Sequence, residues 1–100
     1  MSNKIPVQVM KDLEVLIPRY VERRHKEIEA FRAHLAAGDF EALRVGGHSL
    51  RGSGGGYGFA QLTRIGAAIE IAAKAKDAAA IAPLLDEYAD YMQRVEITYV

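Results

Sequence analysis

Seven of the nine glycines in this 100-residue chain lie between residues 46 and 59, in the run GGHSLRGSGGGYGF. Such a density of glycine is typical of loops, and some glycine-rich loops bind phosphate. The phosphate-loop signature ends in Gly-Lys-Ser/Thr, and the run contains no such triplet. The dinucleotide-binding pattern needs glycines at its first, third and sixth positions, and Tyr57 or Phe59 occupies the sixth. The run is therefore not a nucleotide-binding loop.

The same run fits a helix that begins at Phe40. Successive residues of a helix are about 100° apart around its axis. Five residues then lie within about 60° of Leu43 and form with it one inward-facing stripe: Phe40, Gly47, Leu50, Gly54 and Tyr57. His48 lies about 140° from Leu43, so we expect it to face solvent. Arg44 and Arg51, four residues before it and three after it, lie on the same side.

The glycines of this helix fall into two groups. The first group faces the bundle, where the missing side chain lets another helix come close: Gly47, Gly54 and Gly58. The second group faces outward and leaves the histidine unobstructed: Gly52, Gly55 and Gly56. Each glycine in a helix interior costs roughly 0.5–1 kcal/mol relative to alanine. Several of them around one exposed histidine therefore indicate a function.

Elsewhere, apolar residues recur at intervals of three and four, which predicts helices almost throughout. Besides the helix at Phe40, we expect a short helix over Met10–Ile17, with Leu13, Leu16 and Ile17 inward. A second helix should run from Pro18 to Gly38, and a further one should begin at Phe59. The last helix should follow an N-cap at Asp77, and its apolar stripe reaches Val95. Asp39 is expected to cap the helix at Phe40, and Pro83 predicts a kink or a late start in the last helix. Only residues 5–9, IPVQV, are strand-like.

These elements predict an all-α fold in a single domain over residues 1–100. The short connections indicate an antiparallel up-down four-helix bundle with a short additional N-terminal helix.

Charge and composition narrow the classes of partner. The formal net charge is zero, with 13 basic and 13 acidic side chains, whereas a nucleic-acid-binding domain usually carries a basic excess. No cysteine is present, which excludes a thiolate zinc site and fits a reducing cytosol. Lys11, Asp12 and Glu14 break up the apolar N-terminal segment, unlike a signal peptide. We expect a cytoplasmic monomer or weak associator that binds no membrane and no nucleic acid, and Met1 and Ser2 favour a freestanding protein.

The stretch HSLRGSGGGYGF resembles the motif of histidine phosphotransfer (HPt) domains, which reads His-x-Leu-Lys/Arg-Gly-Ser with a second glycine ten residues after the histidine. The residues on motif positions are His48, Leu50, Arg51, Gly52, Ser53 and Gly58. Residues 69–72, IEIA, are similar to the Leu-Glu-x-Ala ending of the family's next helix. The resemblance covers roughly residues 10–97. It departs at residue 51, where lysine is commoner and arginine presents a planar fork of donors.

The resemblance implies a phosphocarrier of two-component phosphorelays, with His48 as the phosphoacceptor and no kinase or nucleotide site of its own. His48 would exchange a phosphoryl group with receiver-domain aspartates. Arg51 and Arg44 would offset the charge of that group, and the residues for access and docking would be Gly52, Gly55 and Ser53. The partners would be response-regulator receiver domains, with a hybrid histidine kinase as a further candidate. Magnesium would be bound by the receiver, so this chain would hold no metal and no cofactor.

Two other interpretations stay open. One is a helical adaptor that docks receiver or kinase domains without being phosphorylated, although the intact His48 and Arg51 speak against it. The other is a structural bundle whose glycines serve only helix packing, which leaves the outward glycines unexplained. His25 and His34 have no metal-ligand spacing to His48, and we assign them no role.

Overall fold

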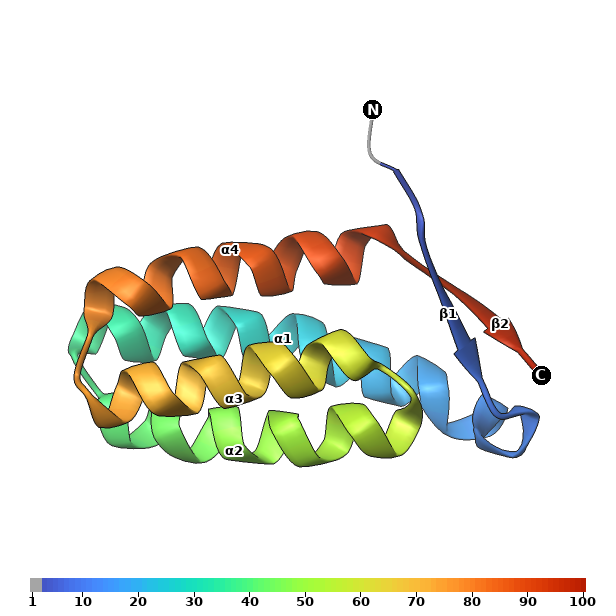
Figure 1. Ribbon diagram of the computed structural model, residues 1–100, viewed down its shortest axis with the longest axis horizontal. Helices are drawn as coiled ribbons and strands as arrows, with labels where there is room; N and C mark the ends of the chain where they lie inside the picture. The colour runs from blue at the N-terminus through green and yellow to red at the C-terminus, as the bar shows by residue number, and fades with distance from the viewer. Residues whose placement is uncertain (1–2) are drawn as a thin grey trace.

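Four helices lie side by side, and two strands form a short sheet at one end of them (Figure 1). The computed structural model describes residues 3–100; Met1 and Ser2, on which the expectation of a freestanding protein rests, lie outside them. In chain order the elements are β1 (Ile5–Val9), the 3-10 helix η1 (Lys11–Leu16), α1 (Ile17–Ala37), α2 (Phe40–Tyr57), α3 (Ala60–Lys74), α4 (Ala78–Arg94) and β2 (Val95–Tyr99).

The predicted helix boundaries are largely confirmed by their caps. Gly38 ends α1 in the left-handed conformation, with a φ of 68°. The Asp39 side chain accepts a hydrogen bond from the amide of Ala42, and that of Asp77 accepts one from the amide of Ala80. Residues 46–57 of the glycine-rich run lie inside α2, as their periodicity predicts.

The two ends of the chain differ from the prediction. The expected helix over Met10–Ile17 is the shorter 3-10 segment η1. Leu13 packs partly buried against the core and Ile17 is buried as the first residue of α1, both as expected, whereas Leu16 is exposed. A segment with one partly buried apolar side chain gains little from continuing as an α-helix. The strand-like residues 5–9 do form a strand, so the chain begins with β1 rather than with a helix.

The last helix also differs from the prediction. It ends at Arg94 instead of carrying its stripe to Val95, because residues 95–99 pair in parallel with β1. The late start at Pro83 is wrong as well, since α4 begins at Ala78. Ala79 and Pro83 are both exposed, so water can solvate the carbonyl of Ala79 that the proline leaves without its usual donor.

The core is a continuous apolar cluster to which all four helices and β1 contribute. Most of the helix residues predicted to point inward are buried. The fully buried members of the core cluster include Leu43, Leu50, Phe59, Leu62, Ile65, Ile69, Ile81, Leu85 and Tyr88. The α2 helix is thereby fixed on α1 and α3 by one face, and its other face stays free.

Helices α2 and α3 come into backbone contact through glycines. A Cβ added at Gly47 would lie 2.8 Å from both the amide nitrogen of Glu70 and the carbonyl oxygen of Gly66. One added at Gly66 would lie 2.5 Å from the amide nitrogen of Arg51. The packing role predicted for Gly47 is confirmed, but Gly58 does not pack against a helix: with a φ of 93° it ends α2.

Candidate functional site

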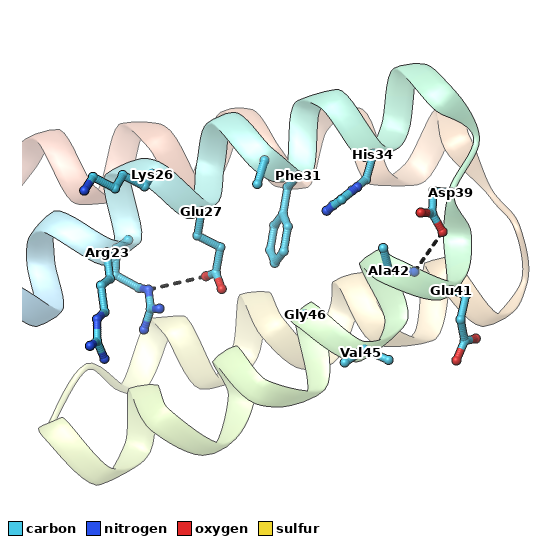
Figure 2. A pocket seen from close by; sticks show the side chains of 12 residues that line it. Arg23, Lys26, Glu27, Phe31, His34, Asp39, Glu41, Ala42, Val45 and Gly46 are labelled. Atoms are coloured by element: carbon cyan, nitrogen blue, oxygen red, sulfur yellow. Dashed lines mark hydrogen bonds and ion pairs between the residues drawn. The ribbon is translucent and has the colours of Figure 1, made fainter.

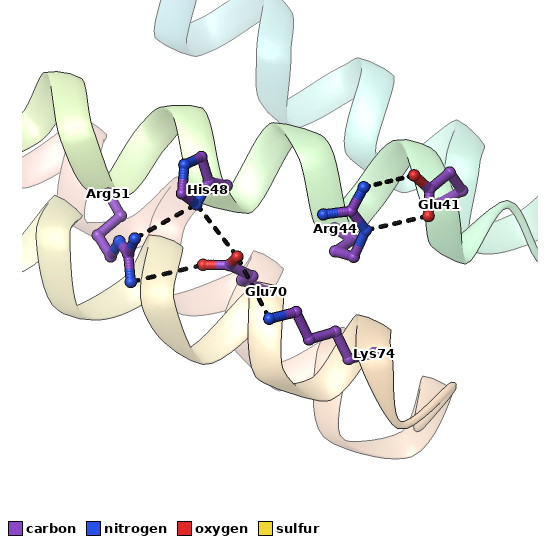
Figure 3. A network of polar contacts seen from close by, with 6 residues as sticks. All are labelled: Glu41, Arg44, His48, Arg51, Glu70 and Lys74. Atoms are coloured by element: carbon purple, nitrogen blue, oxygen red, sulfur yellow. Dashed lines mark hydrogen bonds and ion pairs between the residues drawn. The ribbon is translucent and has the colours of Figure 1, made fainter.

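His48 lies midway along α2, on the side of that helix that meets α3. Its side chain is 59% exposed, so the prediction of a solvent-facing histidine is confirmed. The ring does not stand alone, because its Nδ1 atom lies 3.1 Å from Oε2 of Glu70 on α3 (Figure 3). One edge of the imidazole is thus held by the protein while the rest of the ring is open to solvent.

Glu70 is the one buried charged residue among residues 3–100, with a side chain only 9% exposed. Burial by itself would raise its pKa. The hydrogen bond with His48 and the positive charges around the carboxylate, including Arg51 and Lys74, outweigh that effect and lower the pKa below the usual value for glutamate. Because folding lowers this pKa, the ion-paired carboxylate stabilises the fold above the pKa of unfolded glutamate, about 4.3, and this contribution is lost as the pH falls.

The ionised carboxylate selects one tautomer of the neutral His48 ring. A carboxylate can only accept hydrogen bonds, so Nδ1 must carry the proton that it donates to Glu70. The unprotonated nitrogen is then Nε2, whose lone pair is available for reaction. The arrangement matches the pairing of a histidine with a carboxylate that orients the ring in many enzymes.

Two cations flank the same carboxylate. Arg51 places one guanidinium nitrogen 3.7 Å from Oε1 of Glu70 and another 3.3 Å from Nδ1 of His48. Lys74 places Nζ 3.7 Å from Oε2 of Glu70. Both cations are largely exposed, and Figure 3 shows them on either side of Glu70. An anionic group on His48 would therefore lie near two positive charges. The charge of Arg51 was predicted from the sequence, whereas that of Lys74 was not.

Arg44 lies one turn before His48 on α2. Its guanidinium makes two hydrogen bonds to the carboxylate of Glu41, one turn earlier, and Figure 3 shows this pair separate from the group around His48. The hydrogen bond from Arg44 lowers the pKa of Glu41. Its guanidinium is thus held by Glu41 rather than by His48 or Glu70, and its support of a phosphoryl group remains a prediction.

The outward glycines leave open space next to His48. A Cβ added at Gly52 or Gly56 would meet no atom within 4 Å, whereas one at Gly55 would lie 3.1 Å from Oγ1 of Thr63. Gly52 thus fits the predicted role in access well, and Gly55 less well because it lies against α3. The hydroxyl of Ser53 is 3.1 Å from that of Tyr20 on α1, so the structure places Ser53 against α1 rather than on a docking surface.

Glu70 is the functional residue that the sequence analysis missed. It lies in residues 69–72, IEIA, which resemble the Leu-Glu-x-Ala ending of the family's helix, but the sequence provided no reason to assign it a role. The signal was a glutamate next to the inward Ile69 and four residues after Gly66. A glycine one turn earlier on the same face lets α2 come close enough for the carboxylate to reach the histidine.

A cleft between α1 and α2 is separate from this site (Figure 2). Its floor includes Phe31, whose ring lies where a side chain on Gly46 would be, 2.4 Å from the position of an added Cβ. The lining includes neither His48, Arg51 nor Glu70. Figure 2 shows His34 at this cleft, and within residues 3–100 no group of three or more histidine or acidic side chains could hold a metal ion.

Comparison with protein families gives one result. A family model described as "Hpt domain" matches residues 15–98. The comparison with curated proteins and the comparison with solved structures each give no match. Among the helices of residues 3–100, none combines the length and the apolar character that a bilayer crossing requires.

Proposed function

The chain belongs to the Hpt domain family, and on that premise we propose that it relays phosphoryl groups to and from receiver-domain aspartates, with His48 as the phosphoacceptor. Hpt domains act in phosphotransfer during two-component signalling. The observation that carries the assignment to His48 is its contact with Glu70, which fixes Nδ1 as the protonated nitrogen and leaves Nε2 exposed as a nucleophile.

The proposed step is a displacement at phosphorus. The lone pair of Nε2 forms a bond to the phosphorus of an aspartyl phosphate, the acyl phosphate P–O bond breaks, and the aspartate leaves as a carboxylate. The imidazole keeps its proton on Nδ1 and becomes positively charged as the N–P bond forms. The carboxylate of Glu70 stabilises that charge, and Arg51 offsets the charge of the phosphoryl oxygens. The return of the group to a second receiver is the same step in reverse.

In this proposal the receiver supplies the metal ion. Magnesium bound to the acidic residues of the receiver would neutralise the phosphoryl group during transfer. The bare backbone at Gly52 would let the loops around the receiver's aspartate approach the histidine. The tight turns at Gly38 and Gly58 support the antiparallel up-down order expected for the bundle that presents α2.

The direct test is incubation with a receiver domain that carries a radiolabelled aspartyl phosphate. Label that is labile in acid and stable in base is expected to move to this chain, as a phosphohistidine requires. A chain that binds phosphorylated receivers but never takes up label would instead support the adaptor interpretation.

Glu70→Gln is expected to slow phosphotransfer by at least about tenfold, the lower end of the losses typical when a group that orients a histidine is removed. A glutamine amide can donate to Nδ1 as well as accept from it, so it no longer selects one tautomer. The tautomer is measured from the ring nitrogen shifts of His48 by NMR, alongside the transfer rate.

Glu22→Gln is the matched control, since Glu22 is an exposed carboxylate on α1 whose one ion pair among residues 3–100 is with Lys26. This control should leave both the rate and the tautomer unchanged. Wild-type values of both in the Glu70→Gln variant would contradict the role of Glu70.

Gly52→Gln is expected to slow transfer strongly while the helical content is retained. A Cβ added at this position would meet no atom within 4 Å, so the fold has room for the side chain and we expect the effect to fall on the approach of the receiver. Gly56→Gln is the control, because it adds the same side chain to an equally open position one turn farther from His48. Transfer rates are measured for both, and equal rates in wild type and Gly52→Gln would contradict the role of the open surface.

A further inference from the structure

The small sheet at the chain ends is open on one side. Within residues 3–100 it consists of β1 and β2 alone, paired in parallel from Ile5 opposite Val95 to Val9 opposite Tyr99. A two-stranded sheet is marginally stable in water, and sheets usually gain stability from further strands. The free edge of β2 is therefore a place where another strand would add.

The backbone groups of β2 that face this edge can be identified. Val100 donates to the carbonyl of Val9 and accepts from the amide of Lys11, so its backbone groups face β1. Successive residues of a strand turn their backbone groups to opposite edges. Thr98 and Glu96 therefore face β1 as Val100 does, whereas Ile97 and Tyr99 turn their amides and carbonyls to the open edge.

The two edges of the sheet are protected differently. The outer edge of β1 contains Pro6, which has no amide to offer, and the carbonyl of Gln8 lies against the turn at Gly58. Strand β2, VEITY, has no proline and no lysine, the residues that proteins commonly use to block a free edge. Its β-branched and aromatic residues favour pairing.

Burial falls from β1 to β2 across the face that packs on the bundle. Val7 and Val9 of β1 are buried, at 8% and 1% exposure, whereas Val95, Ile97 and Tyr99 are only half-buried. Six large apolar side chains of residues 3–100 are exposed, and four of them lie at this end of the molecule: Met10, Val15, Leu16 and Val100. The sheet and its surroundings therefore lack a cover on the side of β2.

We propose that this cover is a second copy of the chain, whose β2 pairs antiparallel with the first to give a continuous four-stranded sheet. The sequence of β2 is complementary to itself about a two-fold axis at Ile97. Ile97 then lies opposite Ile97 of the second copy, Val95 opposite Tyr99, and Glu96 opposite Thr98. Apolar residues meet apolar residues and no like charges face each other. This contact pairs the free β2 edge of one copy with the free β2 edge of the other, so no β2 edge remains open and the assembly stops at a dimer.

The dimer is tested first by sedimentation equilibrium over a range of protein concentrations. A short strand pair makes a small interface, so a weak association in the micromolar range is expected. The apparent mass should rise from 11.0 kDa toward twice that value as concentration increases. A chain that stays at 11.0 kDa at every concentration would overturn the proposal.

Two substitutions at one position isolate the edge. Ile97→Pro removes the outward amide without removing a hydrogen bond to β1, and it should abolish the rise in mass while the helical circular dichroism is retained. Ile97→Val keeps the amide and should dimerise like wild type. Dimers that persist in Ile97→Pro would show that the copies meet through another surface.

Cysteine cross-linking tests the register, because the natural chain has no cysteine. The two copies of residue 97 are a directly opposed pair, with Cα atoms about 5.5 Å apart, which a disulfide can span. The two copies of residue 99 lie four residues apart along the strand, about 13 Å, which is too far. I97C should therefore cross-link on mild oxidation and Y99C should not. Equal cross-linking of both, or cross-linking of neither, would contradict this pairing.

The dimer and the phosphotransfer function are tested independently. The sheet lies at the end of the bundle where α2 turns into α3 (Figure 1), whereas His48 is midway along α2 and Glu70 is near the opposite end of α3. Ile97→Pro should accept phosphoryl groups at the wild-type rate at dilutions where both proteins are monomeric. Loss of dimerisation with intact transfer is thus distinguishable from failure of the relay.

Discussion

Replacing His48 by glutamine is expected to abolish the uptake of phosphoryl groups from a phosphorylated receiver. Glutamine has a similar reach, but its amide nitrogen is not a nucleophile, so no N–P bond can form. The side chain is 59% exposed, and the free energy of unfolding should change by no more than about 1 kcal/mol for the lost contact with Glu70. The measurement is transfer of radiolabel from the receiver, combined with thermal unfolding of the variant.

The control for this experiment is His25→Gln, which replaces an exposed histidine of α1. This variant should be labelled as fully as the wild type. Label of the same acid-labile kind on the His48→Gln variant would show that another residue accepts the phosphoryl group, and the assignment of His48 would then be wrong.

Gly66→Ala is expected to destabilise the fold by about 3 kcal/mol, the upper part of the range for an overfilled core. The added methyl group would lie 2.5 Å from the amide nitrogen of Arg51 and 2.7 Å from the carbonyl oxygen of Gly47. Both are backbone atoms of α2, and they cannot rotate away as a side chain would. In a domain of this size the melting temperature should fall by about 12–24 °C, as measured by circular dichroism.

Gly52→Ala serves as the opposite case. It adds the same methyl group to α2 at a position with no atom within 4 Å. Because alanine is the better helix former, stability should rise by about 0.5–1 kcal/mol. If both variants lost stability equally, the backbone contact between α2 and α3 would not be the cause, and a general intolerance of side chains at these glycines would be indicated.

The site-bearing helix could be predicted because its signals are local. The 3.6-residue period places Leu43, Leu50 and Gly54 on one face and His48 on another, and the structure has the same faces. The caps at Gly38 and Asp39 depend only on residues within one turn of them. Such features are visible in a single sequence because their energies come from neighbours along the chain.

What could not be predicted depends on contacts between distant residues. Strand β2 forms because β1, about ninety positions earlier, offers a partner, and its first residue Val95 also fits the preceding helical stripe. Glu70 acquires its position from a close approach of two helices at glycines, which periodicity does not reveal. Ser53 fits the motif by its spacing, yet its hydroxyl is within hydrogen-bonding distance of Tyr20, a residue of another helix.

The glycine contact between α2 and α3 also limits how this site can evolve. Gly47 immediately precedes His48, and Gly66 lies one turn before Glu70, so the width of this crossing sets the 3.1 Å separation between the histidine and its carboxylate. A substitution that adds even one methyl group at the crossing would move Glu70 away from His48 and weaken their hydrogen bond, although the substituted residue contacts neither side chain. The surface around Gly52, where the fold leaves room for a side chain, can therefore change without altering this separation, whereas the crossing itself has almost no room for substitution.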